Sequence, residues 1–129
     1  MQTSRDLEER LLGYGARIIK LVESMPNTLV GRRIADQLLR SATSAGANYE
    51  EARGAESRED FVHKMQIALK GLRESIYWLR LLVKSGKVPE KRMAELLDES
   101  EQMRAMLLKS VVATAKGKAQ EGKCQSIAP

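Results

Sequence analysis

The stretch "RSATSAGANYEEA", residues 40–52, decides which fold this chain can adopt. It consists mostly of Ser, Ala and Gly, with no proline and no alternation of apolar and polar residues that would indicate a strand. Ser and Gly weaken a helix and add little apolar contact. A helix keeps such residues where a neighbouring backbone must come close, or where small polar groups must line one side. The stretch therefore predicts a helix that packs closely against other helices.

Apolar residues at steps of three and four extend the helical pattern over four segments of the chain. The segments are residues 4–24, 29–53, 57–85 and 89–115. Pro26 and Gly54 stand where the first and second segments end, and Pro89 suits the first turn of the fourth. Because the connections are short, consecutive helices must run antiparallel. We therefore predict an all-α fold, an antiparallel up-down-up-down four-helix bundle.

The chain divides into one domain and a tail. Its 129 residues suffice for a single core of ordinary size. After the fourth segment, the text "KGKAQEGKCQSIAP" loses the apolar period and gains Gly and Lys. We predict a bundle over residues 1–115 and a disordered basic tail over residues 116–129.

Composition favours a cytoplasmic protein. The beginning of the chain, "MQTSRDLEERLL", carries acids where a signal peptide is basic, and no apolar run approaches the length that spans a membrane. The single cysteine, Cys124, cannot form an internal disulfide, which fits a reducing compartment. With 22 basic and 17 acidic residues, the net charge of +5 at pH 7 is compatible with an anionic partner.

The helix predicted over residues 29–53 has two distinct flanks. One flank carries small and apolar residues, Ala35, Leu39, Ala42 and Gly46, and permits a close helix neighbour. The other is a polar seam, which consists of Ser41, Ser44, Asn48 and Glu51. Two interpretations of the seam stay open. Its hydroxyls can bond back to carbonyls of their own helix at a solvated edge, or Asn48 and Glu51 can make buried or interfacial hydrogen bonds that select one packing arrangement.

The helix predicted over residues 57–85 has a second apolar stripe opposite its core face. The stripe and the acid within it consist of Ile67, Glu74, Tyr77, Trp78 and Leu81. A bundle helix needs only one apolar stripe, and a monomer seldom leaves such a patch in water. We predict that these residues form an interface with a second copy of the chain. The alternative is that a tilted fourth helix covers them.

The antiparallel topology gathers basic residues at one end of the bundle, which we call the basic pole. It consists of Arg17, Lys20, Arg32, Arg33, Arg40, Arg80, Lys84, Lys87, Lys91 and Arg92. Such a surface can hold nucleic-acid phosphates through Coulomb attraction and counterion release without reading bases. The alternative is that these long side chains only solvate the end of the bundle. We predict sequence-tolerant, salt-sensitive binding of RNA or DNA.

The residues of common catalytic sites are missing from the sequence. His63 is the only histidine, and Asp60-x-x-His63 is one degenerate copy of a motif that di-metal bundles need twice. No glycine-rich phosphate loop occurs, and no Ser or Cys has a second histidine that could activate it. We therefore expect no enzyme activity, no metal and no cofactor.

Two longer runs resemble a known family. They are "QLLRSATSAGANYEE" at 37–51 and "DFVHKMQIALKGLRESIYWL" at 60–79. The chain resembles, over residues 5–115, a family of bacterial four-helix bundle proteins first named for open reading frames in intervening sequences of 23S ribosomal RNA. The positions that match its recurring residues are Arg40, Ser41, Ala42, Asn48, Glu51, Phe61, Ile67, Ala68 and Glu74. Ala52 stands where many members have Gly, and Lys70-Gly71 replaces a common Gly-Ser pair.

The resemblance implies an up-down bundle that assembles as a ring, commonly a homopentamer, with a basic surface. A relative that serves diversity-generating retroelements further implies an accessory that binds reverse transcriptase and nucleic acid. Two hypotheses follow. The chain is a non-enzymatic homo-oligomer that binds nucleic acid through its basic pole, or it is a structural protein–protein interaction module with no nucleic-acid role.

Overall fold

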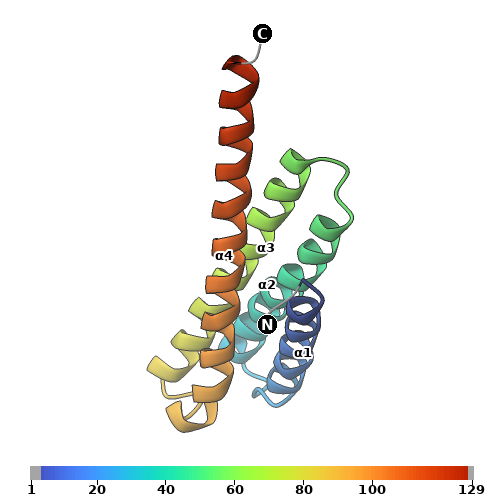
Figure 1. Cartoon of the computed structure of the whole chain (residues 1–129). Helices are drawn as coiled ribbons and strands as arrows, with labels where there is room; N and C mark the ends of the chain where they lie inside the picture. The colour runs from blue at the N-terminus through green and yellow to red at the C-terminus, as the bar shows by residue number, and fades with distance from the viewer. Residues whose placement is uncertain (1–3, 128–129) are drawn as a thin grey trace.

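The computed structural model describes the backbone of residues 4–127 and the side chains of residues 6–116. Its elements are α1 (Ser4–Glu23), α2 (Leu29–Arg53), α3 (Arg58–Lys84) and α4 (Glu90–Ile127), with no strand among the described residues. Consecutive helices run antiparallel and lie side by side (Figure 1). The predicted all-α four-helix bundle is confirmed.

Local signals in the sequence fix most of the helix ends. Thr28 caps α2, since its hydroxyl accepts a 3.0 Å hydrogen bond from the Gly31 amide. Ser57 caps α3 in the same way, accepting from the Asp60 amide at 3.0 Å. Beyond the end of α3, Gly86 has a φ of 77°, a left-handed conformation that favours glycine. The predicted boundaries of α2 and α3 therefore hold to within a residue or two.

The core is built from the stripes that the helical period marks. The helical period places Ile34, Leu38, Ala42, Ala45, Tyr49 and Ala52 on one stripe of α2, and all six are buried. Leu38, Leu72, Leu79 and Leu107 have no exposed surface and represent three of the four helices. Since the chain has few aromatic residues, aliphatic side chains and methionines fill most of this core.

The small residues of α2 allow α3 to approach very closely. Gly71 of α3 lies against the backbone of Ser41 and Ala45. On the other flank of α2, a β-carbon at Gly46 would lie 3.9 Å from the Leu11 carbonyl oxygen of α1, an ordinary contact. The tightest approach therefore occurs beside the polar seam and not on the flank that carries Gly46.

The polar seam satisfies most of its hydrogen bonds within α2. Ser41 is fully buried, and its hydroxyl donates to the Gln37 carbonyl at 2.8 Å. The Asn48 amide donates to the Ser44 carbonyl at 2.9 Å, while Glu51 is exposed. These bonds match the interpretation in which seam side chains bond back to their own helix, except that Ser41 does so in the interior.

The fourth helix is longer than the sequence pattern predicts. It runs to Ile127 and projects beyond the other three helices (Figure 1). The predicted end at Ala115 is therefore wrong. Ala, Lys, Gln and Glu in this stretch favour a helix whether or not it is buried, whereas the apolar period marks burial alone. The division into a bundle of residues 1–115 and a disordered tail of residues 116–129 stays a prediction, because side chains beyond Lys116 lie outside the described residues.

Over the described residues, no helix combines the length and the apolar character that crossing a membrane requires.

Candidate nucleic-acid interface

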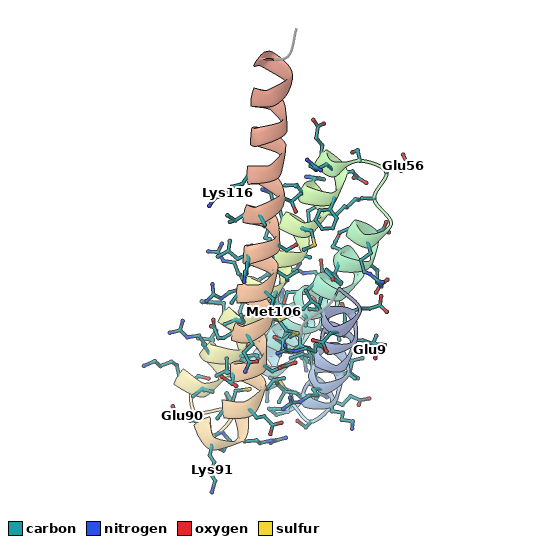
Figure 2. All side chains as sticks on the ribbon, viewed as in Figure 1. Glu9, Glu56, Glu90, Lys91, Met106 and Lys116 are labelled. Carbon is teal, nitrogen blue, oxygen red and sulfur yellow. The ribbon has the colours of Figure 1, made fainter. Side chains whose placement is uncertain are left out.

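The ten residues of the predicted basic pole are all exposed. Nine of them lie where α1 and α3 end and α2 and α4 begin, with Lys87 in the connection between α3 and α4. Arg40 is the exception, because it lies about three turns from the beginning of α2 and pairs with Glu74 of α3. Figure 2 shows Lys91 at this pole and Glu56 at the far end of the bundle.

Most of these cations have no acidic partner. Arg17 lies 3.8 Å from the exposed carboxylate of Glu95, and Arg32 donates to the Asn27 side chain at 2.9 Å. Apart from these two and Arg40, seven residues of the pole remain, namely Lys20, Arg33, Arg80, Lys84, Lys87, Lys91 and Arg92. Their side chains make neither an ion pair nor a hydrogen bond within the described part of the chain. The pole therefore carries an excess of uncompensated positive charge.

A small hollow of about 220 Å³ lies at the pole between α1 and α4. Its cations are Arg17, Lys20 and Arg92, and apolar side chains such as Leu21 and Met93 form the rest of its lining. Its charge suits a phosphate group, and it contains no aromatic ring that could hold a base.

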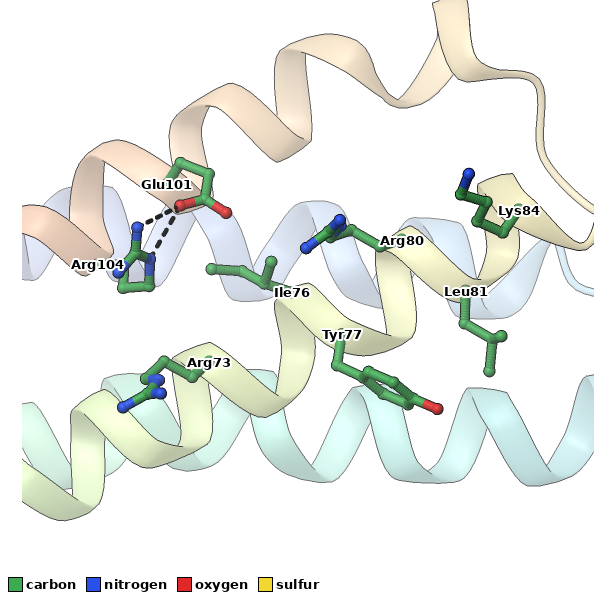
Figure 3. A pocket seen from close by; sticks show the side chains of 8 residues that line it. All are labelled: Arg73, Ile76, Tyr77, Arg80, Leu81, Lys84, Glu101 and Arg104. Carbon is green, nitrogen blue, oxygen red and sulfur yellow. Dashed lines mark hydrogen bonds and ion pairs between the residues drawn. The ribbon is translucent and has the colours of Figure 1, made fainter.

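A larger groove of about 550 Å³ runs between α3 and α4 (Figure 3). We call it the α3–α4 groove. It is lined by Arg73, Ile76, Tyr77, Arg80, Leu81, Lys84, Glu101 and Arg104. The α3 residues recur at steps of three and four, so they share one face of that helix. Four cations face a single carboxylate, and Arg80 and Lys84 belong to both the groove and the basic pole.

The carboxylate of the groove is already occupied. Arg104 donates to Glu101, one turn earlier on α4, at 2.9 Å from Nε and 2.8 Å from Nη2. Since this pair is close to neutral, the net charge of the groove comes from Arg73, Arg80 and Lys84. Arg73 and Arg104 line the groove but are not part of the predicted basic pole. The order of the helices does not reveal which faces of α3 and α4 meet, so it could not predict these two residues.

Tyr77 is the exposed aromatic residue of the groove. Its side chain is 57% exposed, whereas the neighbouring Trp78 is half-buried and packs against the core. The two rings meet edge to face, with centroids 5.0 Å apart. The Trp78 indole donates to Glu74 at 3.2 Å, and Arg40 pairs with the same carboxylate. A chain of contacts from α2 thus holds Trp78, which in turn supports one side of Tyr77.

The predicted interface on the outer face of α3 is partly covered within one chain. Ile67, Glu74, Trp78 and Leu81 are half-buried, and Trp78 and Leu81 pack against the core. Tyr77 alone is highly exposed. Self-association through this face stays a prediction, with less apolar surface behind it than the helical pattern suggests.

Another apolar surface, which the sequence analysis missed, lies between α1 and α2. A hollow of about 520 Å³ is lined there by Leu12, Gly15, Ala16, Ile19, Gly46 and Ala47, among others. Leu12 is 68% exposed and Ile19 43%. We call it the α1–α2 hollow. Leu12 and Ile19 are seven residues apart, about two helical turns, and both lie outside the core stripe of α1. This spacing is the sequence signal that could have revealed the hollow.

No group of three or more His, Cys, Asp and Glu residues that could hold a metal lies within the described residues. His63 is exposed.

The fold and the charged groove define a class, the basic four-helix bundles. Residues 10–109 match the model of a family described as 23S rRNA-intervening sequence protein. The chain belongs to this family, as the resemblance of its α2 and α3 motifs predicts.

A solved structure supports the same assignment. It is the 1.70 Å crystal structure of a protein of unknown function from the S23 ribosomal protein family, from Bacteroides thetaiotaomicron. The two sequences are 31% identical, the TM-score is 0.74, and the match covers 84% of this chain and 96% of the other. The comparison with curated proteins found no match.

Proposed function

We propose that this protein binds nucleic acid, without reading its base sequence, along the α3–α4 groove and the basic pole. The observation that carries the proposal is the charge of the groove, where Arg73, Arg80 and Lys84 face no carboxylate except one that Arg104 occupies. Phosphate groups are the ligands that such a surface attracts most strongly, because binding releases their condensed counterions.

The geometry supports a continuous path for a backbone. Arg73 and Lys84 are separated by about three turns of α3, which is roughly 16 Å at 1.5 Å per residue. Beyond Lys84 the path reaches Lys87 and then the exposed cations at the beginning of α4. The role is one of binding, without chemistry on the bound strand.

The proposal is tested by fluorescence anisotropy with labelled RNA and DNA oligomers of unrelated sequence. The variant Arg73→Gln/Arg80→Gln removes two groove cations. The control Lys64→Gln/Lys116→Gln removes equal charge from outside the groove and the pole. We expect the groove variant to lose about tenfold or more in affinity for every sequence and the control to bind within about twofold of the wild type. Equal losses in both variants would show that only net charge matters.

The α1–α2 hollow supports self-association as a second role. Leu12 and Ile19 are unusually exposed for large apolar residues, and the adjacent Gly15 would allow a helix to approach closely. We propose that a second copy of the chain occupies this hollow, so that the protein is a homo-oligomer. The resemblance to the family supports two further proposals. One is that the copies form a ring, most simply a homopentamer, and the other is that the protein associates with reverse transcriptase.

We infer that the segment of the second copy that occupies the hollow lies on α4. Leu108 and Val112, each 43% exposed, form an apolar stripe one turn apart. Lys109 beside this stripe is a cation, and residues 102–116 contain no acid. The hollow, in contrast, has Glu8 and Glu50 in its lining, and because both pair with the single cation Arg53, one negative charge remains in excess. Opposite charge around apolar contacts favours this pairing over one between two identical α1 surfaces.

A further inference from the structure

We propose that the α3–α4 groove is selective for single-stranded nucleic acid, with one base stacked on Tyr77 and the neighbouring phosphates held by Arg73 and Arg80. This inference rests on the proposed function and adds the class of strand that the groove accepts.

Tyr77 is placed as a platform for a flat ligand. The other aromatic side chains of the described chain are buried or half-buried, and Tyr77 is 57% exposed in a groove. The edge-to-face contact with Trp78 restrains the phenol ring from one side. Because Trp78 is itself held by Glu74 and the core, it keeps the Tyr77 ring positioned before any ligand binds. A positioned ring loses little conformational entropy on binding.

Cations lie one helical turn away on either side of this ring. Arg73 precedes Tyr77 by four residues and Arg80 follows it by three, which makes both of them its neighbours on the surface of α3. Figure 3 shows the Arg80 side chain directed toward α4 and the phenol directed away from the Glu101–Arg104 pair. Along α3, a nucleotide on Tyr77 would therefore have one arginine a turn before it and one a turn after it, each on a long, exposed side chain that can turn toward a phosphate.

The apolar side chains of the groove favour a base over a phosphate. Ile76 is buried and Leu81 half-buried, and both line the groove beside the cations. Stacking on an aromatic ring needs a base whose face is free. In a duplex, each base face is already covered by its neighbours, so a duplex could reach only the cations. The groove therefore distinguishes the two forms through Tyr77, whereas the basic pole attracts both alike.

The test compares a single strand with a duplex. The probes are fluorescein-labelled oligouridylate and oligothymidylate of about 12 nucleotides, within the range of site sizes for single-strand binding, and a labelled duplex of the same length. Anisotropy is measured at one salt concentration for the wild type, Tyr77→Ala and Tyr77→Phe. Trp78, the only tryptophan, reports on the groove through its fluorescence.

We expect the wild type to bind the single strands at least about fivefold more tightly than the duplex. Tyr77→Ala should lose that preference and keep its duplex affinity, whereas Tyr77→Phe should retain the preference because the ring remains. Single strands should change the Trp78 fluorescence of the wild type and of Tyr77→Phe, and not that of Tyr77→Ala. Circular dichroism and light scattering show whether each variant is folded and of unchanged mass.

Three results would overturn the inference. Equal affinities for strand and duplex, with no effect of Tyr77→Ala, would remove the selectivity and leave the proposed function standing. A change of molecular mass in Tyr77→Ala would place Tyr77 in an interface between copies instead. If the wild type bound none of the three probes, the proposed function itself would fail, and the inference with it.

Discussion

Gly71 of α3 lies so close to Ser41 of α2 that a β-carbon at position 71 would come within 2.9 Å of the Ser41 carbonyl oxygen. The Ala45 amide nitrogen would be 3.2 Å away. Both neighbours are backbone atoms inside a helix, so neither can move without displacing α2. The small residues of the stretch at 40–52 thus have a definite partner, since they let the backbones of α2 and α3 approach at Gly71.

This approach predicts that Gly71→Ala destabilises the fold. Despite the better helix propensity of Ala, we expect the free energy of unfolding to fall by about 1–3 kcal/mol, because the added methyl group has no room. Gly13→Ala is the matched control, since a β-carbon there meets no atom within 4 Å and Gly13 lies outside the lining of the α1–α2 hollow. It should raise the stability by about 0.5–1 kcal/mol. Urea denaturation measures both, and a stabilised Gly71→Ala variant would show that the helices are not in contact there.

A second prediction concerns the ion pair that joins α1 to α4. Arg10 donates to Glu99 at 2.9 Å from Nε and 2.6 Å from Nη2, and both side chains are mostly buried. The hydrogen bond from Arg10 lowers the pKa of Glu99 despite the opposing effect of burial. A carboxyl whose pKa is lower in the folded state stabilises the fold above its unfolded pKa, and this stability is lost as the pH falls through the folded pKa.

Glu99→Gln should therefore cost about 1 kcal/mol of stability near neutral pH and progressively less as the pH falls below about 4. Denaturant titrations from pH 7 to pH 3 measure the difference between variant and wild type. Glu95→Gln is the control, because Glu95 is exposed and 3.8 Å from its arginine. A Glu99→Gln deficit that does not change with pH would contradict the assigned pKa direction.

A third prediction concerns the buried hydroxyl pair of Tyr14 and Ser75. Their oxygens are 2.8 Å apart in the core, and burial raises the pKa of Tyr14 to about 12. A phenol with a raised folded-state pKa stabilises the fold fully below its unfolded pKa of about 10, and this stability is lost as the pH rises from there toward 12. The wild type should lose stability over this interval, and Tyr14→Phe should lose less of it. Parallel curves for the two proteins would contradict the prediction.

A fourth prediction tests self-association through the α1–α2 hollow. Leu12→Lys introduces a charge into the apolar surface and should shift the mass measured by light scattering toward that of a single chain. Leu29→Lys is the control, because Leu29 is 64% exposed and lies outside the hollow. If both variants keep the mass of the wild type, a second copy does not occupy the hollow.

The sequence was sufficient to predict the four helices and to place nine of the ten predicted basic residues at one end of the bundle, with Arg40 as the exception. Leu38 and Leu107 recur on apolar stripes that the helical period identifies, and Thr28 and Ser57 are recognisable caps. The basic pole follows from the antiparallel order alone, since this order determines which helix ends meet. The length of α4 could not be predicted from the apolar period, because a helix that extends beyond the bundle needs residues of good helix propensity but does not need an apolar face.

The groove could not be predicted for a different reason. Its composition depends on how α3 and α4 are rotated about their axes, and a rotation of one residue, about 100°, would replace Arg73 or Arg104 by a neighbour. The same rotation decides that Trp78 faces the core and Tyr77 the solvent, although the two are adjacent in sequence. Tertiary packing sets these angles, and apolar periodicity determines them only coarsely.

The most direct test of the central claim, that the α3–α4 groove holds phosphates, is the salt dependence of RNA binding. Log K is plotted against log salt concentration for the wild type and for Arg73→Gln/Arg80→Gln. Each lost phosphate contact to a single strand should make the slope shallower by about 0.7, so the variant should differ by about 1.4. The same slope in both proteins, or an affinity that salt does not change, would contradict the account.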